Sequence, residues 1–338
     1  MGIISHFPGG SAGGGTGLPE FTYENGVCQL IDDGDGNWRI KFLTSGILKF
    51  TKLGGAKGGI DVFLVGGGGA CGYSAGISDW CGPGGGGYTK TIRSVSVQEN
   101  VEYPIVIGAG GQRSTVSNTQ TQGGQTSAIN TSVDGGWSGK SISGGNGGSG
   151  AASSNSTLGG TDGGDGQKGA NGVGEAGKGQ GTTTREFGES IGTLYASGGA
   201  YNASNGTNNV GNGADNTGNG GGGTNNNSKQ TKGGSGIAVI RNSRFAIIQQ
   251  PQDASVADGA SAVFTVKANG TGVKYQWQFL PANGDSATGW SNTSAEGATT
   301  ASLTIVAASY RNGYKYRCIV TKGSSQLISD AATLTITA

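Results

Sequence analysis

The chain has 338 residues, of which 73 are glycine, and its formal net charge at pH 7 is +1. This length suits two or three domains. The chain has no long basic or acidic run, which argues against a nucleic-acid partner. The longest apolar runs, such as residues 60–65, are too short to span a bilayer, and the first residues lack the pattern of a secretory signal. We therefore expect neither membrane insertion nor export through such a signal.

The first 19 residues combine several glycines with Pro8 and Pro19, which predicts an irregular arm rather than a core element. We assign residues 1–37, the arm and the start of a hairpin, to an attachment segment. In this interpretation the segment docks onto other proteins of the same assembly.

From Phe21 onward, short apolar runs separated by polar or glycine-containing turns predict strands. No helical spacing of apolar residues appears before residue 245, so we expect essentially no helix there. The strands on either side of the glycine-rich tract should belong to one antiparallel system, because residues 237–240 alone cannot form a core. The expected strands are 27–31, 38–43, 47–51, 60–65, 88–97, 101–107 and 236–241.

The acidic run after the first of these strands resembles a calcium loop. Asp33, Asp35 and Asn37 would supply oxygen ligands at alternating positions, but Trp38 stands where an EF-hand loop needs glycine. A polar hairpin turn explains the same residues. We favour the hairpin and keep the metal site as the alternative.

Glycine makes up about a third of residues 144–234. Within this tract, glycine recurs at every third position from Gly160 to Gly172, and three residues per turn is the period of a polyproline II helix. Such a helix has no internal hydrogen bonds, so its backbone groups need partners from neighbouring chains. We therefore predict a bundle of polyglycine II helices that bond laterally where missing side chains let backbones approach.

The alternative is a set of irregular loops, pinned by the asparagine side chains of residues 208–209 and 225–227. Collagen is excluded, because the tract has no proline and the repeat breaks after Gly172. We favour the bundle over the loops.

Only eight of the 73 glycines lie after Phe245, which marks a domain boundary. The strands that follow alternate and recur at the spacing of a β-sandwich. Trp277 stands where an immunoglobulin-type core tryptophan belongs, and Tyr316 precedes Cys318 by two residues, as in a tyrosine corner. Val266 replaces the usual first cysteine, so we expect Cys318 to pack without a disulfide, and we interpret Trp277 and Tyr316 as core residues.

The four cysteines have no zinc-finger spacing. Cys71 and Cys81 are close enough in sequence to close a small ring, but spacing alone does not establish the geometry of a disulfide. We expect Cys28 and Cys318 to be buried thiols, as suits a protein made in a reducing cytoplasm.

No pattern indicates catalysis or a cofactor. His6 is the only histidine and lies in the predicted arm, which argues against a Ser-His or Cys-His site. The remaining candidates are aromatic residues of the glycine-rich region, whose flat rings either bind sugars or partner proteins or staple the bundle. They are Tyr73, Trp80, Trp137, Phe187, Tyr195 and Tyr201. For ligand binding we select Trp80, Trp137 and Tyr201.

Four glycine-rich motifs, at residues 59–69, 84–92, 103–111 and 236–241, occur in an order that resembles the glycine-rich domain of bacteriophage tail and adhesin proteins. This resemblance implies a jelly-roll-like β-sandwich with projecting polyglycine II helices over residues 38–242. Residues 245–338 resemble the immunoglobulin-like modules displayed on phage particles and bacterial surfaces.

The resemblance implies a virion protein without enzymatic activity, made in the host cytoplasm and placed at a tail tip or fibre end. Its expected partners are other virion proteins, through residues 1–37, and a glycan or protein of the bacterial cell surface. A homo-oligomer is also expected. The alternatives are a structural decoration or connector protein of the capsid or tail with weak glycan adhesion, and a bacterial surface adhesin.

Overall fold

The computed structural model describes residues 18–337, apart from 35, 55–58, 74–79, 170, 171, 173, 203–210, 225–229, 244, 246, 269–271 and 324. These residues form β-strands and single turns of 3-10 helix, with no α-helix in the described ranges. The predicted all-β fold is therefore confirmed. None of the described helical segments is long and apolar enough to cross a bilayer. The chain divides into two compact units, one ending at Asn242 and the other beginning at Ser243.

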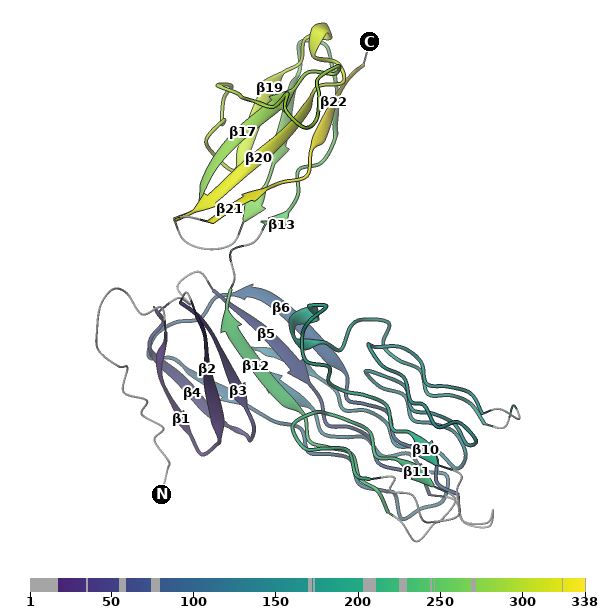
Figure 1. Ribbon diagram of the computed structural model, residues 1–338. Coiled ribbons are helices and arrows are strands. Elements are labelled where there is room, and N and C mark those ends of the chain that lie inside the picture. The colour runs from purple at the N-terminus through teal and green to yellow at the C-terminus, as the bar shows by residue number, and fades with distance from the viewer. Residues whose placement is uncertain are drawn as a thin grey trace. The chain divides into compact units, whose positions relative to one another are not determined.

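Two antiparallel sheets form the sandwich of the first unit (Figure 1). The smaller sheet has the order β1-β4-β7 and the larger has the order β2-β3-β12-β5-β6. The strands of these two sheets are β1 (Glu20–Glu24), β2 (Cys28–Gly34), β3 (Asn37–Phe42), β4 (Gly46–Lys52), β5 (Ile60–Val65), β6 (Thr89–Val95), β7 (Glu102–Ile105) and β12 (Ile237–Asn242).

Strand β12 lies between β3 and β5 and pairs antiparallel with both. The prediction that strands on either side of the glycine-rich tract share one sheet is therefore confirmed. Strand β1, which the sequence analysis missed, pairs with β4, and β2 pairs with β3. The described part of residues 1–37 is thus built into the sandwich, whereas residues 1–17 of the predicted arm lie outside the described residues.

Both faces of the central strands are buried, which explains their continuous apolar runs. Val62 and Ile240 point into the core with Trp38 and Phe50. Phe63 and Val239 point to the opposite face, where residues 186–196 cover them. Alternation along each strand therefore supplies two separate apolar layers.

Beyond the sheet, three strands continue directly into glycine-rich segments. Residues 66–72 follow β5, residues 82–88 precede β6, and residues 231–236 precede β12. Figure 1 shows these extended segments running side by side with others, including β10 (Tyr201–Asn202) and β11 (Gly223–Thr224). The pairing of the strands thus sets the first neighbours of the bundle.

Main-chain hydrogen bonds tie the segments together with a period of three. The amides of Gly66, Gly69 and Gly72 donate to the carbonyls of Tyr88, Gly85 and Gly82 at 2.9, 2.8 and 2.7 Å. Every third amide of one segment therefore faces the same neighbouring segment, as expected for a helix with three residues per turn.

The intervening residues of the same segment face other neighbours. Gly68 and Cys71 donate to Gly234 and Thr231, at 2.9 and 3.1 Å. The carbonyls of Gly67 and Ala70 accept from the amides of Gly136 and Gly139 in a third segment, which belong to the same extended network. Lateral main-chain pairing of this kind supports the predicted polyglycine II bundle, and we call this network the glycine lattice.

The glycine lattice differs from the predicted bundle in its extent. Its central segments lie at residues 66–72 and 82–88, before the predicted tract of 144–234. The threefold sequence repeat from Gly160 to Gly172 does not form one helix, because a turn, in which Gly164 donates to Thr161, interrupts it. Part of the repeat nevertheless pairs as predicted, because the carbonyls of Gly164 and Gln167, three residues apart, accept from Gly150 and Ser153 of one neighbouring segment.

Side chains complete the hydrogen bonding at some positions. Oxygens of Asn146, Asp165 and Asn212 accept from the amides of Lys178, Gly179 and Lys232. The pinning of loops by polar side chains, which was the alternative to the bundle, is therefore also present. Residues 208–209 and 225–227, on which that alternative rested, lie outside the described residues.

The second unit is a β-sandwich whose largest sheet has the order β14-β22-β20-β17-β18, with β21 paired to β20. Two smaller pairs, β15–β19 and β13–β16, complete it. Its strands are β13 (Ile247–Gln249), β14 (Ala254–Ala257), β15 (Ser261–Thr265), β16 (Lys267–Ala268), β17 (Lys274–Leu280), β18 (Ser291–Asn292), β19 (Ser302–Val306), β20 (Lys315–Lys322), β21 (Ser325–Ile328) and β22 (Ala332–Thr337).

The core of this second unit confirms the residues predicted for it. Trp277 on β17 lies directly opposite Cys318 on β20, and both are fully buried. Tyr316 and Val266 belong to the same buried cluster. Cys318 is a thiol, and burial raises the pKa of this thiol to about 12. Cys318 therefore packs in this core as a thiol, as expected.

Candidate functional site

The three aromatic residues selected for ligand binding have different surroundings. The Trp137 side chain is 37 % exposed and is the most accessible of the three, whereas Trp80 is half-buried. Tyr201 is 1 % exposed, so its selection as a surface contact was wrong. The reason is that Tyr201 lies on β10, which pairs with Gly223 of β11, and its ring packs near Trp80 with centroids 6.4 Å apart.

Two further aromatic residues of this region were expected on the surface and are also buried. Phe187 and Tyr195 contact the ring of Phe63 on β5, with centroid distances of 6.0 and 5.6 Å. Tyr73 is half-buried and stacks with the Arg113 guanidinium at 4.7 Å. Phe187 and Tyr195 therefore close the second apolar layer of the sheet and do not staple the glycine bundle.

A charged network attaches the segment around Phe187 to the sheet. Glu186 belongs to the 3-10 turn η2 (Glu186–Gly188), and its carboxylate accepts hydrogen bonds from Arg39 at 2.6 Å and from the Tyr195 hydroxyl at 3.1 Å. Lys41 lies 3.1 Å from the same carboxylate. Burial alone raises the pKa of Glu186, but the hydrogen bond from Arg39 and the charge of Lys41 outweigh it and lower the pKa.

A second ion pair is buried between adjacent strands. Asp61 on β5 lies opposite Arg241 on β12, and Nε of Arg241 donates to Oδ2 of Asp61 at 3.1 Å. Arg93 reaches the same carboxylate at 3.3 Å, and Arg241 also binds Glu189 at 2.7 Å. Each of these carboxylates is held by guanidinium groups, an arrangement that fixes structure rather than offering a free acid or base.

The acidic run near β2 forms a hairpin turn, as favoured. Strands β2 and β3 pair directly across it, and Asn37 begins β3. Asp33 forms an ion pair with Arg39 at 2.8 Å. Asp35 lies outside the described residues, and among the described residues no group of three potential metal ligands occurs. The described geometry therefore brings Asp33 to a cation of the protein itself rather than to Asn37.

Among the cysteines, the structure records no disulfide in the described ranges. Cys71 and Cys81 are both fully buried, with their side chains hydrogen bonded to each other. Cys318 is buried as expected, whereas Cys28 is only half-buried, because it begins an edge strand of the larger sheet.

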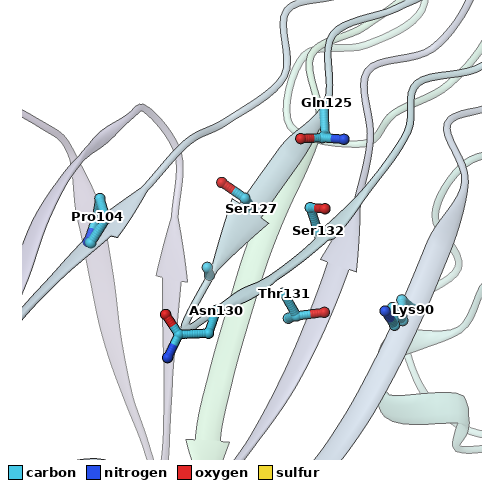
Figure 2. Close-up of a pocket in the computed structure, with 8 residues that line it drawn as sticks. Lys90, Pro104, Gln125, Ser127, Asn130, Thr131 and Ser132 are labelled. Carbon is cyan, nitrogen blue, oxygen red and sulfur yellow. The ribbon is translucent and has the colours of Figure 1, made fainter.

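A polar hollow of about 450 Å³ lies beside the hairpin formed by β8 (Thr126–Ala128) and β9 (Thr131–Val133) (Figure 2). Its lining offers hydroxyls, side-chain amides and one ammonium group, all able to bond a polar ligand. The lining residues are Lys90, Pro104, Gln125, Ser127, Ala128, Asn130, Thr131 and Ser132. Sequence reasoning missed this hollow, because serine, threonine and asparagine in a short hairpin carry no distinguishing pattern.

The candidate surface also includes one end of the glycine lattice. This end lies farthest from β5 and β6, along the segments that join these strands. There Cys71 donates to Thr231, Cys81 donates to Thr224, and Gly82 donates to Ser141. These bonds join residues 71–73 and 80–82, the described turn at residues 139–143, and residues 224 and 231. Main-chain bonds thus hold the described residues at this end of the lattice together, and we call these residues the turn cluster.

The comparison with known sequences concerns the first unit. No curated protein matches the chain. The family described as Glycine-rich domain matches residues 44–243, which is more than half of the chain and covers the glycine lattice and the strands β4, β5, β6, β7 and β12 of the sandwich. The chain therefore belongs to the glycine-rich domain family.

Proposed function

We propose that this chain is a virion protein without enzymatic activity, a tail-tip or tail-fibre adhesin that recognises the bacterial host surface. The observation that carries the proposal is the glycine lattice, in which neighbouring segments bond through their main chains and hold the turn cluster at one end. Loops on a rigid scaffold bind partners with little loss of conformational entropy. The protein assembles as a homo-oligomer, with residues 1–37 bound to other virion proteins.

The ligand in this proposal is a glycan or protein of the bacterial surface. Trp137 supplies a partly exposed ring, and the polar hollow of Figure 2 supplies hydroxyl and amide groups of the kind that bond sugar hydroxyls. The second unit is proposed to be an immunoglobulin-like module, supported by the buried pair of Trp277 and Cys318.

The first test is the location of the protein. Antibodies raised against the purified chain should label the tail end of the virus particle in immunogold electron microscopy. Label on the capsid or tail shaft would instead support a decoration or connector protein, and label on a bacterial envelope without virus would support a bacterial adhesin. Either result would overturn the proposal that the chain is a tail-tip or tail-fibre adhesin.

The second test is adsorption. The purified chain should bind host cells saturably and slow virus adsorption in competition. Trp137→Ala should weaken this competition, while Trp290→Ala, a change at a half-buried tryptophan of the second unit, serves as the matched control. Unchanged competition by Trp137→Ala would remove that ring from the site, and a chain that never binds host cells would remove the receptor-binding function.

These tests use point substitutions because deletion of the tract would destroy the scaffold. Residues 144–234 include Gly221 and Gly234, whose main chains bond to Gly69 and Gly68. Deleting them would leave those central groups without partners. Lost adsorption after such a deletion would not separate binding from folding.

One observation favours the structural alternative. Tyr201, Phe187 and Tyr195 are buried within the unit instead of forming a binding face. A decoration or connector protein would need the stiffness of the glycine lattice without an aromatic ligand site. Location on the particle distinguishes this alternative from the adhesin.

A further inference from the structure

The strongest unassigned feature is the buried pair of Cys71 and Cys81 in the turn cluster. The two residues lie on neighbouring antiparallel segments, where Gly72 donates to Gly82 at 2.7 Å. Both thiols are 0 % exposed, and their side chains are hydrogen bonded to each other. Two sulfurs held in contact by adjacent main chains meet the first requirement for a disulfide, which is proximity without backbone movement.

The main chain on both sides of the pair is fixed. Cys71 donates to Thr231 at 3.1 Å, while Cys81 donates to Thr224 at 2.8 Å and accepts from the same residue at 3.1 Å. Gly72 and Gly82 follow the two cysteines, so no bulky side chain stands next to either sulfur on that side. The lattice therefore holds the two cysteines together in the absence of a covalent bond.

We propose that Cys71 and Cys81 form an intramolecular disulfide when the protein meets a low-molecular-weight disulfide as oxidant. The bond closes a ring of residues 71–81 and links two neighbouring segments of the glycine lattice covalently. This inference does not depend on the proposed function, since it concerns only the chemistry of the pair.

The reaction is a thiol–disulfide exchange. The Cys71 thiolate attacks one sulfur of oxidised glutathione, a sulfur–sulfur bond forms, and one glutathione thiolate leaves. Cys81 then gives its proton to solvent and attacks the Cys71 sulfur, releasing the second glutathione thiolate. The two protein thiols are oxidised, and one oxidised glutathione is reduced to two molecules of the thiol.

The surroundings of the pair favour this order of attack. The hydrogen bond from Cys81 lowers the pKa of Cys71 and raises the pKa of Cys81. The positive charge of Arg113 acts to lower the pKa of both thiols. Cys71 is thus the nucleophile, because the thiolate is the reactive form of cysteine.

The experiment measures an equilibrium, because burial of both sulfurs slows the entry of an oxidant. The full chain is incubated to completion in glutathione buffers of increasing reducing power, quenched with acid, alkylated and digested with trypsin. The peptide of residues 58–90 contains both cysteines, and after alkylation its reduced form carries two alkyl groups, whereas its disulfide form carries none. The same series is run on the chain unfolded in guanidinium chloride.

We expect the folded chain to keep the disulfide in buffers at least about tenfold more reducing than those that reduce it in the unfolded chain, since the lattice raises the effective concentration of one thiol at the other. The proposal would be overturned if the folded chain lost the disulfide in buffers no more reducing than those that reduce it in the unfolded chain. It would also be overturned if the reaction stopped at a glutathione adduct of Cys71. The decisive comparison uses only the wild-type sequence, so it does not depend on whether a variant folds.

Two variants serve as controls. Cys318→Ser removes a buried thiol of the second unit and should leave the equilibrium of the 58–90 peptide unchanged. Cys81→Ser should carry at most a single glutathione on Cys71 and never the mass of an internal disulfide. A change in the wild-type equilibrium caused by Cys318→Ser would assign the oxidation to a different pair of cysteines and overturn the proposal.

Discussion

At the scale of the residue, the glycine lattice depends on the absence of side chains. A Cβ built on Gly68 would collide with the main-chain carbonyl of Asn219, and a Cβ on Gly67 would collide with that of Ala109. In both cases the obstacle is backbone, which a rotamer change cannot move away. Close approach of main chains, rather than turn geometry, is thus what requires glycine at these positions.

Replacement of a central glycine should therefore be costly. We expect Gly68→Ala to lower the free energy of unfolding by roughly 3 kcal/mol or more, because overpacking against backbone forces neighbouring segments apart. Gly211→Ala is the matched control, since a Cβ there meets nothing within 4 Å, and its effect should stay within about 0.5 kcal/mol. Urea unfolding followed by circular dichroism measures both, and equal effects would show that the lattice is not close-packed.

Burial of single aromatic residues could not be predicted from the sequence. Tyr201 and Phe187 lie in glycine-rich surroundings without an apolar pattern, so nothing near them in the chain indicates a core. Their partners are distant in sequence, as Phe63 is for Phe187. By contrast, Trp277 and Tyr316 were recognised as core residues, because each lies in a strand with regular alternation.

At the scale of the element, the segment with η2 covers the sheet through both apolar and charged contacts. Phe187 packs on Phe63, and the Arg241 guanidinium lies 4.0 Å from the Phe187 ring. Glu186 anchors the same turn to β3 through Arg39 and Lys41. This segment thus covers the second face of the larger sheet, and its ion pairs make its attachment depend on pH.

We expect Glu186→Gln to destabilise the protein at pH 7 by roughly 2 kcal/mol, because two cations would lose a buried carboxylate. The folded pKa of Glu186 lies below its ordinary value of 4.5, so this contribution is present above pH 4.5 and is lost as the pH falls further. In urea unfolding from pH 7 down to pH 3, the free energies of unfolding of the wild type and of Glu186→Gln should converge. The exposed Glu175→Gln is the control, and a pH-independent difference would contradict the assignment.

The strands of the first unit were predictable to different degrees. Strands β3, β5 and β12 were expected within one or two residues of their observed bounds, because apolar runs and alternation mark them. Strand β1 and the hairpin of β8 and β9 were missed. The sequence of β8 and β9 is rich in serine and threonine, and their pairing is decided by the neighbouring backbone rather than by local pattern.

The lattice itself was predictable in kind, but its extent was predicted only in part, because its central segments precede the tract of residues 144–234. Glycine content indicated lateral main-chain bonding, but the regular repeat after Gly160 is interrupted by a turn at Gly164 and takes part in the lattice only in pieces. The uninterrupted run Gly66–Gly69 carried the stronger signal, because it directly continues a buried strand. Which segments become neighbours depends on long-range hydrogen bonds, such as the one from Gly68 to Gly234, which spacing in one sequence does not encode.

At the scale of the whole molecule, the two units have separate cores. Trp38, Phe50 and Val62 belong to the core of the first unit, and Trp277 and Leu303 belong to that of the second. Each core contains residues from its own unit alone. Each unit therefore has the apolar burial needed to fold by itself.

We accordingly expect the full chain to unfold in two transitions and residues 243–338 to fold alone. Leu303→Ala should lower the stability of one transition by about 2–5 kcal/mol, as for a large-to-small change in a core, while Gly68→Ala should shift only the other. Differential scanning calorimetry resolves the transitions, and tryptophan fluorescence of the isolated 243–338 fragment reports burial of Trp277. A single transition that both substitutions shift equally would mean that the units unfold together, because two-state behaviour would then extend over the whole chain.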